Sequence, residues 1–424
     1  MAGGVFNLRV VSDSVPDWSS RENFVRSALS GWKTDHEKAL AQFRWSYLSR
    51  RVGSTWYDHG RAVHDPILFF NSYGMTMCGD ISSINCALWE ASGWKARNID
   101  VHDHVVAEAF YDGGWHMFDN DFCNYFLDKK GGVASGQALH EGRKRVKGEH
   151  YLFDHCPTAS CRGGRIYMGP SSWALPGVAR DWWDRYRPRV VFAGSKAGQR
   201  YVLGVRPGES YTRYWRPLGL GARFCRMRRG KDPMSKGGSV LMNCRANGKW
   251  EWSPDLSDPG VLFAALNVRQ SKKGVAARKP GEKAQAVFRV TAANVVTSAR
   301  LSALVSGDVR FSASGNGGVS WIPVAAESDQ EGALGGALPR DLGGRLEYLL
   351  RAELGEGAVL RELKLETLTQ VNPRTLPALR LGRNRIAAVS DEHLEYLTFY
   401  PRLANDAHAK ECLRADKWQS ISKP

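Results

Sequence analysis

The segment from Cys78 to Asp119 decides the fold of the first part of the chain, and it reads CGDISSINCALWEASGWKARNIDVHDHVVAEAFYDGGWHMFD. Apolar residues first recur at helical spacing, at Ile81, Ile84, Leu88 and Trp89. Gly93 then ends the predicted helix. From residue 101 the side chains alternate with the period of a strand, and the DGG sequence at 112–114 predicts a hairpin turn. We therefore expect a cysteine-bearing helix followed by antiparallel strands.

The residues before this segment are predicted to be helical. Ser19 and Glu22, and again Thr34 and Glu37, have the spacing of a capping box at a helix start. Helices followed by antiparallel strands indicate an α+β domain, which we place at residues 1–165.

The remainder of the sequence has the pattern of short strands and turns that is typical of all-β modules. Short β-like runs such as RYVLGV, AQAVFRVTA and VLRELKLETL are separated by turn residues. We expect a basic, aromatic-rich β region or connector at 166–260 and a C-terminal β-sandwich at 261–424.

The strongest global signal is the formal net charge of +16. Such a charge favours polyanionic partners, among them acidic or glycan-bearing substrates. Between Lys196 and Lys231 there are ten basic residues and one acid, Glu209. Arginine forks interleaved with aromatic rings suit carboxylate-bearing or sulfate-bearing sugars, so candidate substrate-binding residues are Arg213, Tyr214, Trp215 and Arg216. Nucleic acid is a minor expectation because no nucleic-acid fold signature is present.

Targeting signals are not apparent. The sequence has no apolar run long enough for a membrane helix and no secretory signal at its start. We expect no membrane span. A secreted or periplasmic location follows if a leader has been removed, and a cytoplasmic location otherwise; the oligomeric state is left open.

The eight cysteines do not form the pattern of a disulfide scaffold or of a zinc site. We therefore predict no metal and no cofactor. Cys78 differs from the other cysteines because it begins a helix, where exposed N–H groups favour a thiolate. His104, on a strand facing this helix, would be its base. Asp119, on the returning strand, would orient the imidazole, and Cys86 is expected in the core.

These residues resemble the transglutaminase-like superfamily, which has a papain-like core. The family has a nucleophilic cysteine opening a helix, a strand entry with Ala-Arg, a histidine with glutamate four residues later, and Gly-x-Trp before an aspartate. The matching positions are Cys78, Ala87, Gly93, Ala96, Arg97, His104, Glu108, Gly114, Trp115 and Asp119. The match covers about 90 residues, and about 150 with the leading helices. It departs from the family at Val106, where an aromatic residue is frequent, and in the short interval from Cys78 to His104.

The resemblance implies a thiol enzyme that attacks an amide or other acyl centre, with Cys78, His104 and Asp119 as the catalytic triad. Hydrolysis is favoured over cross-linking, because the acids of this region are scattered and do not form a calcium loop. Further candidates for the oxyanion hole or cleft are Asn71, Tyr73, Trp115, His102 and Tyr111. Glu108 is expected to be a structural partner of Arg97 or of a backbone group.

Two other functions stay open. The first is a polysaccharide lyase or other acidic-glycan-degrading enzyme, in which His104 is the base, Tyr73, Tyr111 or Tyr125 the acid, and arginines neutralise the substrate carboxylate. The second is a glycan-binding protein without catalysis. A carbohydrate connection is also indicated by SGNGGVSW at 314–321, which resembles the Asp-box hairpin with Asn316 in place of its aspartate.

Overall fold

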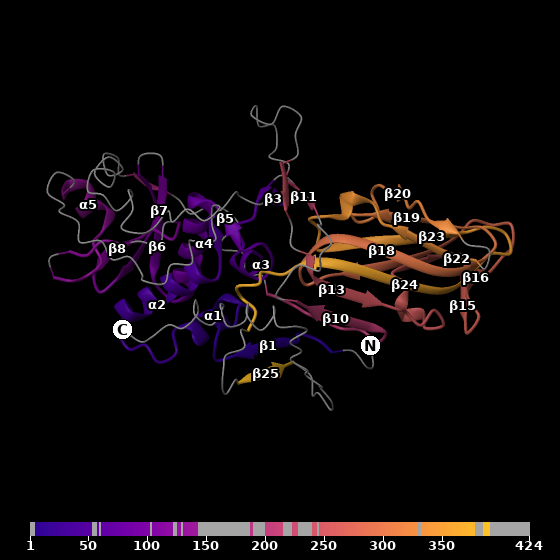
Figure 1. Cartoon of the computed structure of the whole chain (residues 1–424), viewed down its shortest axis with the longest axis horizontal. Coiled ribbons are helices and arrows are strands. Elements are labelled where there is room, and N and C mark those ends of the chain that lie inside the picture. Colours follow the sequence, from indigo (N-terminus) through magenta and orange to yellow (C-terminus); the bar gives the residue numbers. More distant parts are fainter. Residues whose placement is uncertain are drawn as a thin grey trace, which may run out of the picture.

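The computed structural model describes residues 5–52, 57–58, 61–101, 104–121, 125–128, 130–142, 187–189, 200–214, 223–227, 240–243, 246–328, 332–377 and 385–390. Figure 1 shows a unit of helices and short strands beside an elongated unit of long strands. The first contains the described residues between 9 and 142, together with 187–189. The second, here called the two-sheet unit, contains most of residues 200–377.

The first two helices begin at the predicted kind of cap. Helix α1 (Arg21–Ala28) is capped by Ser20, whose side chain accepts from the backbone of Asn23. The prediction of Ser19 as the cap was therefore wrong by one position. Helix α2 (Asp35–Leu48) has the complete capping box of Thr34 and Glu37, which confirms that prediction.

The chain reaches the cysteine through an unusual turn. Helix α3 (Pro66–Leu68) continues into the π-helix η1 (Phe69–Tyr73), and Gly74 follows with a left-handed φ of 59°. After the short strand β5 (Met75–Thr76), helix α4 (Cys78–Ala91) begins. Gly93 has a φ of 90°, and this left-handed residue directly after Ser92 ends the helix as predicted.

Helix α4 packs on an antiparallel sheet with the strand order β8-β7-β6-β9. The strands are β6 (Lys95–Val101), β7 (His104–Tyr111), β8 (Gly114–Phe118) and β9 (Arg187–Arg189). The β7–β8 turn has φ values of 48° at Asp112 and 77° at Gly113, so the predicted hairpin is confirmed. Trp89 of α4 shares a buried cluster with Ala107 of β7 and Phe43 of α2. Helix α5 (Gly136–Gly142) follows this sheet.

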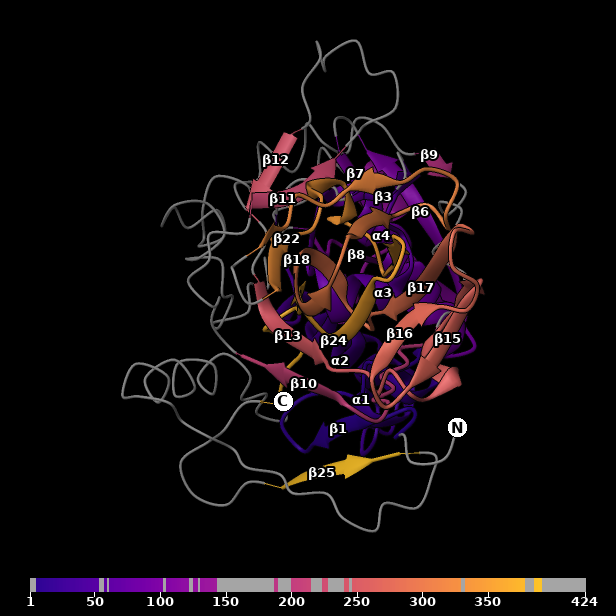
Figure 2. The same ribbon diagram turned by 90° about the vertical axis from the view of Figure 1, so that its right-hand side faces the viewer.

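The two-sheet unit consists of two antiparallel sheets with a common core, and Figure 2 views it end-on. One has the order β10-β13-β24-β18-β22-β21, with β16 and β15 attached to β24. Its strands are β10 (Glu209–Arg213), β13 (Ala246–Trp252), β15 (Val268–Ser271), β16 (Gly274–Ala277), β18 (Val295–Ser306), β21 (Glu327–Ser328), β22 (Ala333–Ala337) and β24 (Val359–Gln370). The other comprises β14 (Ala264–Leu266), β17 (Ala284–Thr291), β23 (Glu347–Leu354), β19 (Val309–Ser314) and β20 (Ile322–Pro323).

Two sets of pairings cross the domain boundaries proposed from the sequence. Strands β10 and β13 belong to the first sheet, so the two-sheet unit begins well before residue 261. Strand β9 pairs with β6, so the N-terminal unit includes residues beyond 165. In both cases the partner strand lies far away in the sequence, where local patterns carry no information about it.

The remaining elements are short. They are β1 (Arg9–Ser12), paired with β25 (Ile386–Val389), together with β2 (Arg51–Val52), β3 (Tyr57–Asp58), β4 (Arg61–Ala62), β11 (Arg223–Met227), β12 (Val240–Asn243) and the 3₁₀ helices η3 (Pro259–Val261) and η4 (Arg340–Leu342). Within the described part of the chain, no helix combines the length and apolar character needed to cross a membrane.

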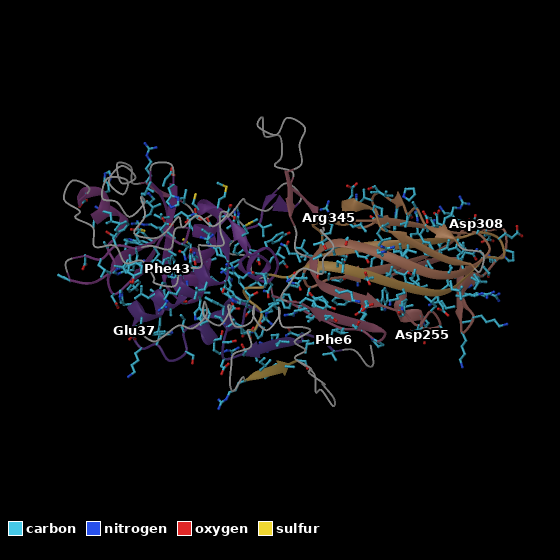
Figure 3. All side chains as sticks on the ribbon, viewed as in Figure 1. Phe6, Glu37, Phe43, Asp255, Asp308 and Arg345 are labelled. Carbon is cyan, nitrogen blue, oxygen red and sulfur yellow. The ribbon has the colours of Figure 1, made fainter. Side chains whose placement is uncertain are left out.

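The two units meet at the π-helix that precedes Cys78. Three buried amide side chains of the two-sheet unit, here called the clamp (Asn294, Gln370 and Asn372), donate to this region. Their acceptors include the backbone carbonyls of Ser49, Phe70, Asn71 and Ser72, at 2.7–3.1 Å. Figure 3 shows side chains filling both units, with Phe43 inside the first and Asp308 toward the far end of the second.

Candidate active site

Cys78 is the first residue of α4. Met77 occupies the N-cap position and its apolar side chain supplies no cap, so the N–H groups of the first turn point their positive ends toward the cysteine. The side chain of Cys78 is partly exposed, whereas Cys86, two turns later, is fully buried and contacts Asn98 at 3.4 Å. Only the first of these two thiols is accessible, and the expectation that Cys86 lies in the core is confirmed.

His104 and Asp119 lie together at one end of the N-terminal sheet. His104 is the first residue of β7, and Asp119 directly follows β8. The antiparallel pairing of these strands brings the two side chains together, with 2.8 Å between Nε2 of His104 and Oδ2 of Asp119. The other carboxylate oxygen, Oδ1, accepts from the backbone N–H of Asp121 at 2.9 Å. The carboxylate is therefore fixed on both sides.

The thiol of Cys78 lies beside the imidazole of His104. Its sulfur is within 4.8 Å of a ring nitrogen of His104, and the Cys78 side chain raises the pKa of the imidazole. Because Nε2 is bonded to Asp119, we assign Nδ1 as the nitrogen that interacts with the thiol. The order of contacts is thus cysteine, histidine, aspartate, which is the arrangement that a thiol nucleophile requires.

Electrostatics at His104 favour its charged form. Burial lowers the pKa of this imidazole, but the Asp119 carboxylate and the Cys78 side chain raise it, and the net result is a pKa well above 6.5. A protonated His104 beside a cysteine stabilises the thiolate form of that cysteine. The electrostatics of the site therefore favour a charged His104 beside the Cys78 side chain.

A second carboxylate, Asp121, also lies at the site. One of its oxygens, the Cys78 sulfur and a His104 nitrogen are all within 4.8 Å of one another. Asp121 Oδ1 is 3.4 Å from the guanidinium of Arg50, which is buried and also donates to the carbonyl of Asn120. Burial raises the pKa of Asp121, although Arg50 and His104 oppose this. The sequence analysis did not identify Arg50 or Asp121 as site residues. Their contact joins positions that are 71 residues apart, and Arg50 lies in a segment without a motif.

Asp80, with its partners Thr76 and His64, fixes the start of α4. Asp80 accepts from Thr76 Oγ1 at 2.9 Å and pairs with His64 Nε2 at 2.6 Å. The carboxylate in the first turn also suits the positive end of the helix. His64 was not predicted from the sequence. These contacts fix the turn that positions Cys78.

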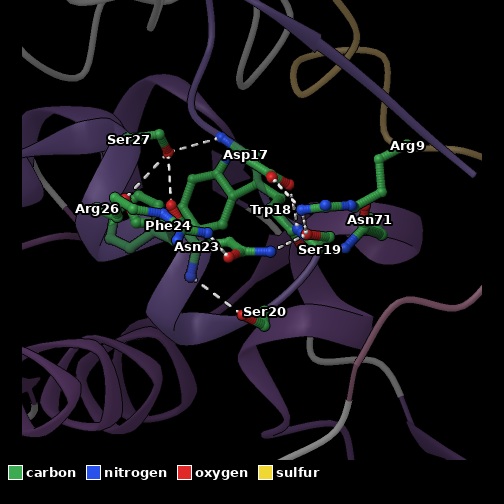
Figure 4. Close-up of polar contacts among 10 residues, drawn as sticks. All are labelled: Arg9, Asp17, Trp18, Ser19, Ser20, Asn23, Phe24, Arg26, Ser27 and Asn71. Carbon is green, nitrogen blue, oxygen red and sulfur yellow. Dashed lines mark hydrogen bonds and ion pairs between the residues drawn. The ribbon is translucent and has the colours of Figure 1, made fainter. Parts of the chain in front are cut away.

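The proposed oxyanion residues Asn71 and Tyr73 lie in the π-helix. The side chain of Asn71 donates to the carbonyls of Trp18 and Ile67, at 2.7 and 2.8 Å. Figure 4 shows Asn71 beside Trp18, whose ring stacks on Phe24 with 4.1 Å between centroids. Tyr73 is buried in the cluster below α4. The structure thus places both side chains in packing roles next to the segment that leads to the cysteine.

The cleft candidates Trp115 and Tyr111 lie at the other end of the hairpin from His104 and Asp119. The two residues adjoin the β7–β8 turn, and the guanidinium of Arg97 lies over the Trp115 ring at 3.8 Å. Tyr111 is buried and its hydroxyl is 3.1 Å from His36 Nδ1. The structure therefore does not bring these two residues together with Cys78.

The tyrosines considered for a lyase are all buried in hydrophobic clusters. Tyr73 packs below α4, while Tyr111 and Tyr125 belong to the cluster between α2, α4 and the sheet. The expected ion pair of Glu108 is confirmed: its fully buried carboxylate accepts from Arg97 Nε at 2.7 Å and from the Gly136 N–H at 2.6 Å.

The candidate substrate-binding residues belong to the two-sheet unit. Arg213 donates to the Tyr201 hydroxyl at 2.9 Å, and that hydroxyl donates to Asn294 of the clamp at 2.8 Å. The backbone of Tyr214 pairs with Asn247. His102, Trp215 and Arg216 lie outside the described residues, so the basic segment is only partly placed.

The segment 314–321 contains the last residue of β19 and the loop that leads to β20. Asn316 Oδ1 accepts from the Ser320 N–H at 3.0 Å, and Ser314 Oγ accepts from the Gly318 N–H at 2.9 Å. Arg351 lies over the Trp321 ring at 4.4 Å. The short polar side chains are thus used to close the turn.

Comparison with known proteins found no relative: the sequence matches no protein-family model and no curated protein.

Proposed function

We propose that the N-terminal unit is a transglutaminase-like (papain-like) thiol enzyme joined to a C-terminal β-sandwich, and that it acts on an amide or other acyl centre. The observation that carries the proposal is the position of His104, which is bonded to Asp119 through Nε2 and has a ring nitrogen within 4.8 Å of the Cys78 sulfur. A partly exposed cysteine at a helix N-terminus, next to a buried and oriented imidazole, has the parts of an activated nucleophile.

The reaction follows from these positions. The thiolate of Cys78 attacks the carbonyl carbon, and the electron pair of the C=O bond moves to the oxygen. The first-turn N–H groups of α4 stabilise this oxyanion. As the tetrahedral intermediate collapses, Nδ1 of His104 gives its proton to the leaving group and a thioester remains on Cys78. Nδ1 then takes a proton from water, which attacks the thioester and releases the acid and the thiolate.

Hydrolysis is proposed over transfer to an amine, and the substrate is proposed to be polyanionic or to carry a glycan. The net charge of +16 supports a polyanionic substrate through long-range attraction. Arg213, on β10 of the two-sheet unit, and the adjacent Tyr214 are the described members of the four residues proposed to bind it.

The test is acylation of Cys78 by p-nitrophenyl acetate, a general acyl donor. We expect a burst of p-nitrophenol equal to the enzyme concentration and an acetyl group on the peptide that contains Cys78. Cys78→Ala removes the burst, and His104→Ala lowers its rate by orders of magnitude. Cys86→Ala, a matched cysteine substitution on the same helix, retains the burst.

The opposing result is equally definite. If no acetyl group is found on Cys78, or if Cys78→Ala keeps the burst, the thiol mechanism is wrong. If Cys78→Ala depolymerises an acidic glycan to products with ultraviolet-absorbing unsaturated ends, the lyase function replaces it.

A further inference from the structure

The three groups that meet at Cys78 are also a set of metal ligands. Cys78 Sγ, a ring nitrogen of His104 and a carboxylate oxygen of Asp121 come from the start of α4, the start of β7 and the turn after β8, and all lie within 4.8 Å of one another. In a tetrahedral zinc site such atoms are about 3.3–3.6 Å apart, given metal–ligand bonds of about 2.0–2.3 Å. Small side-chain rotations would close the remaining difference.

The surroundings resemble those of a metal-binding histidine. His104 Nε2 is bonded to Asp119, and metal-ligating histidines are commonly oriented by a carboxylate on their second nitrogen. Arg50 holds Oδ1 of Asp121, so Oδ2 is the oxygen that we assign to the metal. Two carboxylates and a thiol face one guanidinium and the His104 imidazole, whose proton at the metal-binding nitrogen is displaced when a dication binds. The partly exposed side of Cys78 is the route of entry.

We propose that Cys78, His104 and Asp121 form a Zn²⁺ site that inhibits the enzyme by occupying its nucleophile. Sulfur and nitrogen ligands suit zinc better than magnesium or calcium, which prefer oxygen. Zinc on Cys78 and on Nδ1 of His104 would block both the attack and the proton transfer. The inhibitory part rests on the proposed function, whereas the metal site rests on the three positioned ligands alone.

The experiment uses the full chain, freed of metal with a chelator, and ZnCl₂ as the probe. Alkylation of Cys78 by iodoacetamide is followed by peptide mass spectrometry at increasing zinc. We expect zinc to protect Cys78 and EDTA to restore its alkylation. Asp121→Asn should raise the zinc concentration for half protection about 100-fold, since even loss of a group behind a ligand lowers affinity by about 10–100-fold. Each variant is compared with its own metal-free rate.

Asp112→Asn is the matched control, because Asp112 is exposed in the β7–β8 turn, away from the site. It should retain the wild-type protection curve. Cys86 reports folding, since this buried thiol stays unreactive in a folded variant. A Co²⁺ titration gives a second readout, a sulfur-to-cobalt charge-transfer band that Cys78→Ala removes and Asp121→Asn weakens. The other cysteines contribute the same background in all variants.

The zinc inference is overturned if zinc does not protect Cys78, or if Asp121→Asn is protected as well as the wild type. The latter result would indicate binding by thiol and imidazole without the carboxylate. If acylation of Cys78 succeeds while Asp121 has no effect on zinc, only this inference fails. If acylation fails while the Asp121-dependent cobalt band is present, the metal site stands and the proposed function fails.

Discussion

The side chain of Asn372 fills the space that a Cβ atom on Gly74 would occupy: such an atom would lie 2.5 Å from Cγ of Asn372. Asn372 belongs to the two-sheet unit, and Gly74 ends the π-helix four residues before Cys78. The segment that leads into the nucleophile therefore rests directly on the other unit. We infer that the two-sheet unit is a structural base for the site, and the first two predictions test this.

Asn372→Ala should destabilise the protein by about 2 kcal/mol or more, because buried carbonyls lose a donor. The Asn372 amide donates to the carbonyls of Ser49 and Phe70 at 2.7 and 2.8 Å, and it is buried. Urea denaturation measures the loss. Gln270→Ala is the control, since its amide also donates to two carbonyls but is partly exposed, and it should cost much less. Equal losses would contradict the role of the clamp.

Gly74→Ala should be more destabilising than Gly113→Ala. Both glycines have left-handed φ values, 59° and 77°, so both variants bear the cost of about 1–2 kcal/mol of an L-residue in this region. A Cβ on Gly74 would also clash with the Asn372 side chain, whereas nothing lies within 4 Å of a Cβ on Gly113. Overpacking adds about 1–3 kcal/mol. Similar urea midpoints for the two variants would show that the Asn372 side chain can move away from a Cβ on residue 74 with little loss of unfolding free energy.

Glu108→Ala should cost about 3 kcal/mol in unfolding free energy, because it leaves Arg97 and the Gly136 N–H without their buried acceptor. Glu353→Ala is the control: Glu353 pairs with Arg351 on a strand of the two-sheet unit, but its side chain is 36% exposed. Exposed pairs contribute about 0–1 kcal/mol. A decrease in unfolding free energy of less than about 1 kcal/mol for Glu108→Ala would contradict a structural role of Glu108.

Stability should depend on pH through His104. Its folded-state pKa is raised, so its stabilising interaction with Asp119 is fully present below the unfolded-state pKa of about 6.5 and is lost as the pH rises through the folded-state value. The difference in unfolding free energy between wild type and Asp119→Asn should therefore be largest near about pH 6 and decrease toward about pH 9. A difference that grows with pH would contradict the charged form of His104.

Local sequence patterns predicted the local parts of the site. The start of α4 at Cys78 and the β7–β8 hairpin follow from periodicity and turn residues, and the hairpin itself brings Asp119 back to His104. Arg50 and Asp121 were not identified because their role depends on a contact across 71 positions of sequence. The side chain of Asn71 turns toward Trp18, 53 positions away, which no local pattern specifies.

The same limit applied to the domain boundaries. Strand β13 pairs with β24, more than a hundred residues later, and this pairing assigns residues before 261 to the two-sheet unit. The sequence analysis placed this segment in a β region or connector, and its sheet could not be read from local patterns.

The most direct test of the central claim compares alkylation of Cys78 in the wild type and in His104→Ala as a function of pH. The claim is that a charged His104, held by Asp119, keeps the Cys78 sulfur in its reactive form. Iodoacetamide should therefore modify wild-type Cys78 rapidly at about pH 6, whereas in His104→Ala the reaction should require the alkaline range of an ordinary thiol, near about 8.5. Buried Cys86 should stay unmodified in both proteins. Identical pH profiles for Cys78 in the two proteins would contradict the claim.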